Sequence, residues 1–132
     1  MDSQPSVLIV DHSDDTREVL QTALQRRGCR TLAAGGAKAG LDLARRHRPD
    51  LIVLDLELDD SGGEDFSARF AEQSRTHGTR LVMLGSVWDQ PIGRCPTSVG
   101  ARRVAPPEGE LVPKPYHYGP LIRRIEELLG TT

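Results

Sequence analysis

The chain is poor in cysteine, in aromatic residues and in long apolar runs. Of its 132 residues only Cys29 and Cys95 are cysteines, too few and too far apart for a zinc site or a disulfide framework. Both thiols are expected to be reduced. No apolar run approaches the roughly 20 residues that span a bilayer. These absences exclude a disulfide scaffold and a membrane-spanning protein.

The chain also has no excess of charge of one sign. Its formal net charge is −2, which gives no general attraction to nucleic acid or to an anionic membrane. The first residues lack the basic start and apolar core of a signal peptide. We therefore expect a cytoplasmic protein that binds neither nucleic acid nor membrane.

Two short apolar runs that each end in an aspartate are the most informative feature. Val7–Val10 is followed by Asp11, and Leu51–Leu54 is followed by Asp55. An apolar run without alternation is typical of a strand buried on both faces, as in a parallel sheet covered by helices. Such sheets bind ligands outside the carboxyl ends of their strands, where both carboxylates would lie.

Strand and helix patterns alternate along most of the chain. Ser13 is a candidate N-cap for a first helix that Gly28 ends, and Gly85 is expected to end the last of the buried strands. The further expected elements are strands at 29–34 and 81–84 and helices at 37–47, 64–76 and 118–129. Alternation of this kind predicts one doubly wound α/β domain over residues 1–132, with an ordered core at about 6–130.

The alternation fails between Ser86 and Pro115, where five prolines exclude a long helix. This predicts an irregular or shortened fourth helix region. An edge strand could form at Arg102–Val104 or at Glu110–Val112, and the sequence leaves both open.

These residues carry a resemblance to a known family. The run into Asp11, the run 48–56 around Asp55, the later Gly63, and Lys114-Pro115 before an amphipathic helix together resemble the receiver domain of bacterial response regulators. The resemblance implies a five-stranded parallel sheet in the flavodoxin-like order 2-1-3-4-5. It also implies that the protein is a signalling module and not an enzyme.

The resemblance assigns a phosphoryl acceptor and a magnesium site. Asp55 stands at the position that accepts a phosphoryl group from a histidine kinase or phosphotransfer protein. The implied Mg²⁺ ligands are an acidic pair after the first strand, Asp55, and the backbone carbonyl of Glu57. Here only Asp11 of the pair is present, because His12 replaces the second acid. Imidazole suits zinc, copper or nickel better than magnesium, so the magnesium site should be weakened.

The role of His12 stays open at this point. It is either a tolerated neutral residue in a weakened site or a group with a pH-sensing or transition-metal role. Asp14 or Asp15 could compensate for the lost acid, although a helix would point them to solvent.

The family pattern also includes residues that respond to phosphorylation, and some of these are replaced here. Lys114 resembles the lysine that pairs with the phosphorylated aspartate, and the family's peptide bond before the following proline is often cis. The family's switch hydroxyl aligns with Gly85, which has no side chain, and Ser86 comes one residue late. Leu111 stands where the family has its switch aromatic.

Two functions remain as hypotheses. The first is a stand-alone receiver that is phosphorylated on Asp55 and signals by protein contact through the surface near Val87–Tyr118, with homodimerisation allowed by the resemblance. The second is a pseudo-receiver that keeps the fold and signals without phosphate. A flavodoxin-like cofactor binder is disfavoured, because no phosphate-cradling loop follows the first strand.

Overall fold

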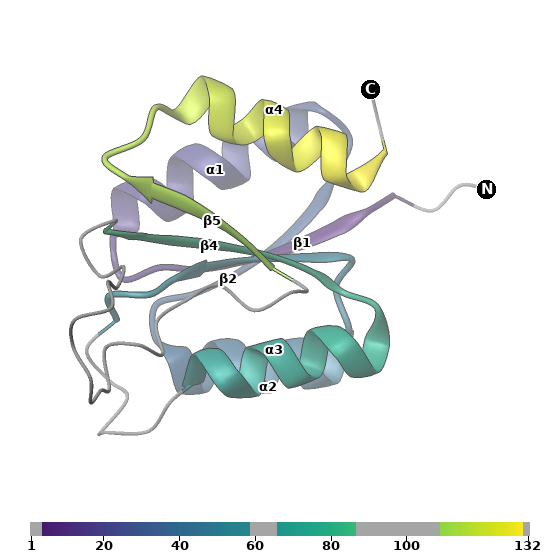
Figure 1. Ribbon diagram of the computed structural model, residues 1–132. Helices are drawn as coiled ribbons and strands as arrows, with labels where there is room; N and C mark the ends of the chain where they lie inside the picture. The colour runs from purple at the N-terminus through teal and green to yellow at the C-terminus, as the bar shows by residue number, and fades with distance from the viewer. Residues whose placement is uncertain (1–3, 59–65, 87–108, 131–132) are drawn as a thin grey trace.

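The computed structural model describes residues 4–58, 66–86 and 109–130. Five parallel strands form one sheet in the order β2-β1-β3-β4-β5 (Figure 1). The strands are β1 (Ser6–Val10), β2 (Arg30–Ala34), β3 (Leu51–Asp55), β4 (Arg80–Ser86) and β5 (Gly109–Lys114). The helices are α1 (Asp14–Arg26), α2 (Ala37–His47), α3 (Phe66–His77) and α4 (Tyr118–Leu129). The predicted fold class and strand order are confirmed.

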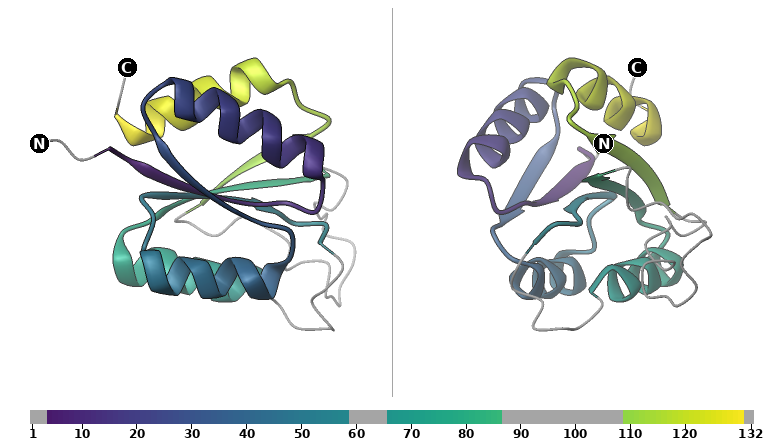
Figure 2. Two further views of the ribbon diagram at one scale, coloured as in Figure 1. Left: turned by 180° about the vertical axis from the view of Figure 1, so that it is seen from behind. Right: turned by 60° about the vertical axis from the view of Figure 1, so that its left-hand side comes forward.

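Helices cover both faces of the sheet, α1 and α4 on one face and α2 and α3 on the other (Figures 1 and 2). This explains why the central strands are apolar without alternation, since every side chain of β3 is buried. Each face has its own apolar cluster, one around Ile9 and Ile125 and the other around Leu8 and Phe70. Neighbouring residues of β1 thus serve opposite sides of the sheet.

The local signals of the first helix act as predicted. Ser13 caps α1, its side chain accepting a hydrogen bond from the Thr16 amide at 3.2 Å. Gly28 follows the helix with φ of 89°, a conformation that glycine adopts without strain. The turn then returns the chain to β2 beside β1, where Ser6 pairs with Arg30.

The edge strand is the second of the two predicted alternatives. β5 includes Glu110–Val112, whereas Arg102–Val104 lies outside the described residues, as does the predicted irregular fourth helix region. Pro113 lies within β5 and is exposed. A proline is tolerated there because the missing amide belongs to the outermost strand of the sheet.

The prediction that Gly85 ends its strand was wrong, because β4 continues to Ser86. Gly85 is buried and pairs in register with Pro113, and Ser86 pairs with Lys114. Pairing with β5 holds the backbone of Gly85 extended, which overrides the local preference of glycine for turns. The same pairing brings Lys114 to the carboxyl edge of the sheet.

Gly40 provides a direct test of how closely α2 packs on β1. A Cβ atom at this position would lie 2.7 Å from Cγ2 and 2.8 Å from Cγ1 of Val10, a fully buried side chain. Gly40→Ala should therefore lower the free energy of unfolding by about 1–3 kcal/mol through overpacking, despite alanine's better helix propensity of about 1 kcal/mol. Urea denaturation measures this change.

Gly119 in α4 is the matched control. Its two neighbours in the chain aside, a Cβ there would meet nothing within 4 Å. Because Pro120 disfavours the helical conformation of a preceding residue that carries a Cβ, the gain in helix propensity is offset, and Gly119→Ala should change stability by less than about 1 kcal/mol. Equal effects of the two substitutions would contradict the close contact between Gly40 and Val10.

Candidate functional site

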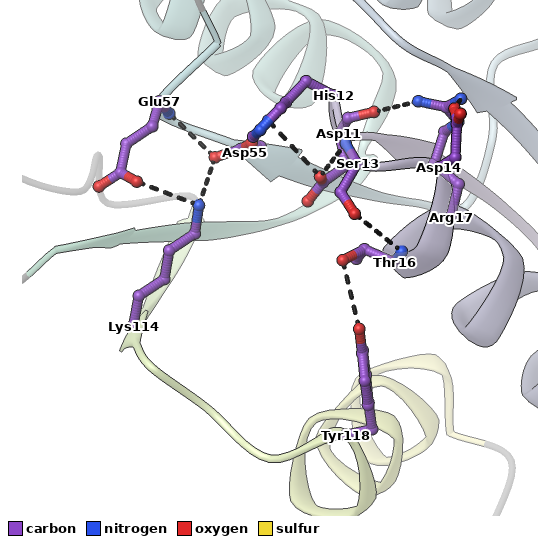
Figure 3. Close-up of polar contacts among 10 residues, drawn as sticks. All are labelled: Asp11, His12, Ser13, Asp14, Thr16, Arg17, Asp55, Glu57, Lys114 and Tyr118. Carbon is purple, nitrogen blue, oxygen red and sulfur yellow. Dashed lines mark hydrogen bonds and ion pairs between the residues drawn. The ribbon is translucent and has the colours of Figure 1, made fainter.

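Asp11 and Asp55 lie at the carboxyl edge of the sheet, one directly after β1 and the other at the end of β3. Their side chains are 4% and 0% exposed. The register places Val10 beside Leu54, so the two aspartates follow paired positions on neighbouring strands. The two strand-ending carboxylates therefore share one buried pocket (Figure 3).

Both carboxylate oxygens of Asp55 have hydrogen-bond partners. Oδ1 accepts hydrogen bonds from Lys114 Nζ at 2.8 Å and from the Glu57 amide at 2.9 Å. Oδ2 lies 2.9 Å from Nδ1 of His12 (Figure 3). The residue that replaces the family's second acid thus contacts the candidate acceptor directly, a contact that the sequence pattern does not reveal.

These partners keep Asp55 ionised. Burial by itself raises the pKa of a carboxyl group, because the charged form loses its hydration. The hydrogen bonds from Lys114, the Glu57 amide and His12 outweigh burial and bring the pKa of Asp55 below its ordinary value. A charged carboxylate is the nucleophilic form of this side chain.

Asp11 behaves in the opposite way. Burial raises its pKa, the hydrogen bond from the Ser13 amide at 2.9 Å lowers it, and the nearby charge of Asp55 raises it further. The net pKa lies above the ordinary value. The pKa values of the two carboxyl groups therefore differ, and Asp55 is the stronger acid of the pair.

Lys114 reaches the pocket from the end of β5. Its ammonium also lies 3.2 Å from Oε1 of Glu57, and its side chain is 24% exposed. Burial alone would lower the lysine pKa, but the hydrogen bond and charge of Asp55 and the contact with Glu57 raise it. Lys114 is therefore a fixed cation beside Asp55, and its peptide bond to Pro115 is cis.

The position of the expected switch hydroxyl is closed by an apolar side chain. A Cβ on Gly85 would lie 3.1 Å from Cδ1 and 3.3 Å from Cβ of Leu56. Leu111, at the position of the switch aromatic, packs against the cluster that includes Leu56. The side chain of Ser86 is outside the described part of the structure, so its switch role stays a prediction.

One further polar contact near the pocket was not predicted. The hydroxyl groups of Thr16 in α1 and Tyr118 in α4 lie 3.2 Å apart. The ring of Tyr118 stands edge-on to that of Tyr116, with centroids 5.8 Å apart. Both tyrosines pack against the apolar cluster around Ile125, and the hydroxyl contact links α1 to α4. Asp14 and Asp15 are exposed, as expected, and Asp14 pairs with Arg17.

Comparison with known proteins identifies the family of this chain. The family model of the response regulator receiver domain matches residues 7–104, which is more than half of the chain. The chain belongs to this family. Receiver domains are signalling modules of two-component systems that interact with histidine kinases or phosphotransfer proteins and bind Mg²⁺ at an acidic pocket. The acidic pocket of this receiver domain contains Asp11 and Asp55.

Curated relatives extend the similarity along the whole chain. The receiver domain is 40% identical over 135 residues to the probable transcriptional regulatory protein TcrX of Mycobacterium tuberculosis, covering 99% of this chain and 53% of TcrX. It is 30% identical over 129 residues to the transcriptional regulatory protein CseB of Streptomyces coelicolor, covering 98% of this chain and 51% of CseB. The chain thus spans about half the length of these relatives.

Solved structures show the same fold at lower identity. The chemotaxis protein CheY4 of Vibrio cholerae superposes with a TM-score of 0.71 at 21% identity, covering 96% of this chain and 99% of that protein. The receiver domain of the Francisella response regulator 1452 gives a TM-score of 0.72 at 21% identity, with coverage of 96% and 98%. Within residues 4–58, 66–86 and 109–130, no helix has the length and apolar character needed to cross a membrane.

Proposed function

We propose that Asp55 of this receiver domain accepts a phosphoryl group from a phosphohistidine on a histidine kinase or phosphotransfer protein. The observation that carries the proposal is the contact of 2.8 Å between Lys114 Nζ and Oδ1 of Asp55 at the end of β3. This contact holds a buried carboxylate in its ionised form at the edge of the sheet where ligands bind.

The proposed step is an in-line transfer. A carboxylate oxygen of Asp55 forms a bond to phosphorus as the bond between phosphorus and the donor imidazole nitrogen breaks, and the imidazole leaves. Negative charge gathers on the phosphoryl oxygens during the transfer. Lys114 is placed to neutralise part of it, since its ammonium already lies between Asp55 and Glu57.

A divalent cation fits the carboxylates of this pocket. Oδ2 of Asp11 accepts no hydrogen bond from the described residues, although the side chain is buried. Asp11 and Asp55 would hold the cation, and the carbonyl of Glu57 stays a prediction as a further ligand. When bound, the cation supplies additional neutralisation of phosphoryl charge.

The proposed output is a contact with another protein, with no enzymatic reaction and no recognition of nucleic acid or membrane by this domain. Of the predicted surface Val87–Tyr118, residues 87–108 lie outside the described part of the structure. A homodimer through this region also stays a prediction.

The second candidate is a pseudo-receiver that signals without phosphorylation. Two observations favour it. His12 already contacts Oδ2 of Asp55, and Leu56 closes the space over Gly85 where the family's switch hydroxyl would project. The two candidates differ in one measurable property, the capacity of Asp55 to take up phosphate.

Incubation with a small acyl phosphate and a divalent cation, followed by intact-protein mass spectrometry, tests the proposal. The wild type should gain one phosphoryl group, and Asp55→Asn should gain none because the side-chain amide of asparagine is not a nucleophile in neutral solution. Asp42→Asn is the matched control, since Asp42 is an exposed carboxylate of α2.

The alternatives predict other outcomes. An unlabelled wild type would favour the pseudo-receiver. Labelling of Asp55→Asn at the wild-type level would show that another residue accepts the phosphoryl group. Loss of labelling in Asp42→Asn as well would point to a general effect of charge and would count against Asp55 as the acceptor.

A further inference from the structure

His12 places a nitrogen donor in a pocket whose other donors are carboxylate oxygens. Asp11, His12 and Asp55 each offer one ligand atom, and these atoms all lie within 4.8 Å of one another. His12 is 63% exposed, whereas the two aspartates are buried. The cluster therefore has two buried carboxylate donors and a third donor, an imidazole nitrogen, at the entrance.

One oxygen of the buried Asp11 carboxylate accepts no hydrogen bond from residues 4–58, 66–86 or 109–130. Oδ1 accepts from the Ser13 amide at 2.9 Å, but no described residue donates to Oδ2. The nearest nitrogen of His12 is 3.9 Å from Oδ1, beyond hydrogen-bond distance. A buried carboxylate oxygen without a partner is costly, and a bound cation would satisfy it.

The spacing between His12 and Asp55 suits ligands of one metal ion. Nδ1 of His12 and Oδ2 of Asp55 are 2.9 Å apart. With metal–ligand distances of about 2.0–2.2 Å, two ligands lie about 3.0 Å apart at right angles and about 3.4 Å apart in the tetrahedral arrangement that zinc prefers. The same two atoms can thus exchange their hydrogen bond for a shared metal ion by moving apart by about 0.5 Å or less.

We propose that Asp11, His12 and Asp55 form a mixed nitrogen and oxygen site that binds a divalent first-row transition ion, such as Zn²⁺, in preference to Mg²⁺. Magnesium requires near-octahedral oxygen ligands, and the donor nearest to Asp55 Oδ2 is an imidazole. Imidazole together with carboxylates suits zinc and its neighbours. The donor set of this chain therefore departs from the all-oxygen magnesium site of receiver domains.

This inference rests on the proposed function for its biological role, since it concerns the same pocket. Metal binding is nevertheless measured without a phosphodonor. A domain that binds zinc through His12 but takes up no phosphoryl group would contradict only the proposed function. A domain that is phosphorylated but binds zinc without His12 would contradict only the metal site.

Isothermal titration with Zn²⁺ and separately with Mg²⁺ provides the test, on the wild type, His12→Asp and His12→Ala. Any carboxylate site binds zinc more tightly than magnesium, so the informative quantity is the change in the ratio of the two affinities. We expect one zinc ion per chain, with an affinity that falls about tenfold or more in His12→Ala. His12→Asp should raise the magnesium affinity about tenfold or more by restoring an oxygen ligand.

His47→Ala is the matched control, because His47 is an exposed histidine at the end of α2. It should bind zinc as the wild type does. Equal zinc affinity in the wild type and His12→Ala, or equal magnesium affinity in the wild type and His12→Asp, would overturn the proposal.

A second measurement needs no variant that could fail to fold. Co²⁺ added to the wild type should give visible absorption bands that differ from those of cobalt in water, and excess Zn²⁺ should remove them. A spectrum identical to that of cobalt in water at saturating protein would contradict the site.

Discussion

Phe70→Ala is expected to lower the free energy of unfolding by about 3–5 kcal/mol, the usual range for removing a fully buried phenylalanine. Phe70 lies in α3 with 0% exposure and packs against the cluster of Leu8, Ile52 and Met83 beneath the sheet. Only 4% of the residues are aromatic, so the core is mostly aliphatic, and the other ring packed against this cluster, Phe66, is itself only partly buried. The cavity left by the substitution would therefore be filled poorly.

Phe66 is the matched control for this prediction. It stands one helical turn earlier in α3, is only partly buried, and lies beneath the guanidinium group of Arg69 at 5.6 Å. Phe66→Ala should cost clearly less, because less apolar surface is removed from contact. Urea denaturation of both variants checks the order, and an equal or larger loss for Phe66→Ala would contradict the packing described for α3.

Much of the fold could be predicted because the signals are local or depend only on burial. The apolar runs that end in Asp11 and Asp55 predict central strands, since a strand covered on both faces needs apolar side chains at every position. Parallel strands then place both carboxylates at the same edge of the sheet. Ser13 likewise caps its helix through atoms only three residues away.

The remaining features depend on residues far apart in the sequence. Gly85 favours a turn by itself, yet pairing with Pro113 extends its strand. The side chain that covers the Gly85 position is that of Leu56, which follows β3 directly in the chain. No local pattern reports which way such a side chain points, because rotamer choice follows the packing around it.

The contact of His12 with Asp55 is a similar case. The sequence identifies His12 as the departure from the family pattern, but the direction of its ring depends on the turn that follows β1 and on the position of β3. The hydrogen bond joins His12 directly to Asp55, and the role of the imidazole stays a prediction. Whether the imidazole donates to Asp55 or shares a metal with it is the question that the zinc and magnesium titrations answer.

Lys114→Met is expected to lower the free energy of unfolding at neutral pH by about 2–3 kcal/mol. The substitution keeps the apolar stem of the side chain and removes the ammonium that lies 2.8 Å from Oδ1 of the fully buried Asp55. Removing one partner of a buried pair commonly costs 3–5 kcal/mol, because the other charge stays buried. The value should be smaller here, since Lys114 is partly exposed and the Glu57 amide and His12 still contact the carboxylate.

Lys38→Met is the matched control, because Lys38 is the chain's other lysine and is exposed in α2. Its free energy of unfolding should change by less than about 0.5 kcal/mol. The double variant Asp55→Asn/Lys114→Met removes both charges of the pair. Its loss in free energy of unfolding should therefore be smaller than the sum of the losses in Lys114→Met and Asp55→Asn, by about 1–3 kcal/mol. Additive effects would show that the two side chains do not stabilise each other.

The pH dependence of the same pair provides an independent test in the presence of a chelator. The pKa of Asp55 is lowered in the folded domain, so its contribution to stability is present above the ordinary carboxyl pKa and is lost as the pH falls through the folded value. Without Lys114, burial should raise the pKa of Asp55, and ionisation near neutral pH should then cost stability. The difference in unfolding free energy between wild type and Lys114→Met should accordingly shrink as Asp55 is protonated on acidification. A difference that stays constant from neutral to acidic pH would show that the lysine acts by packing alone, and would remove the ion pair as a support for an ionised acceptor.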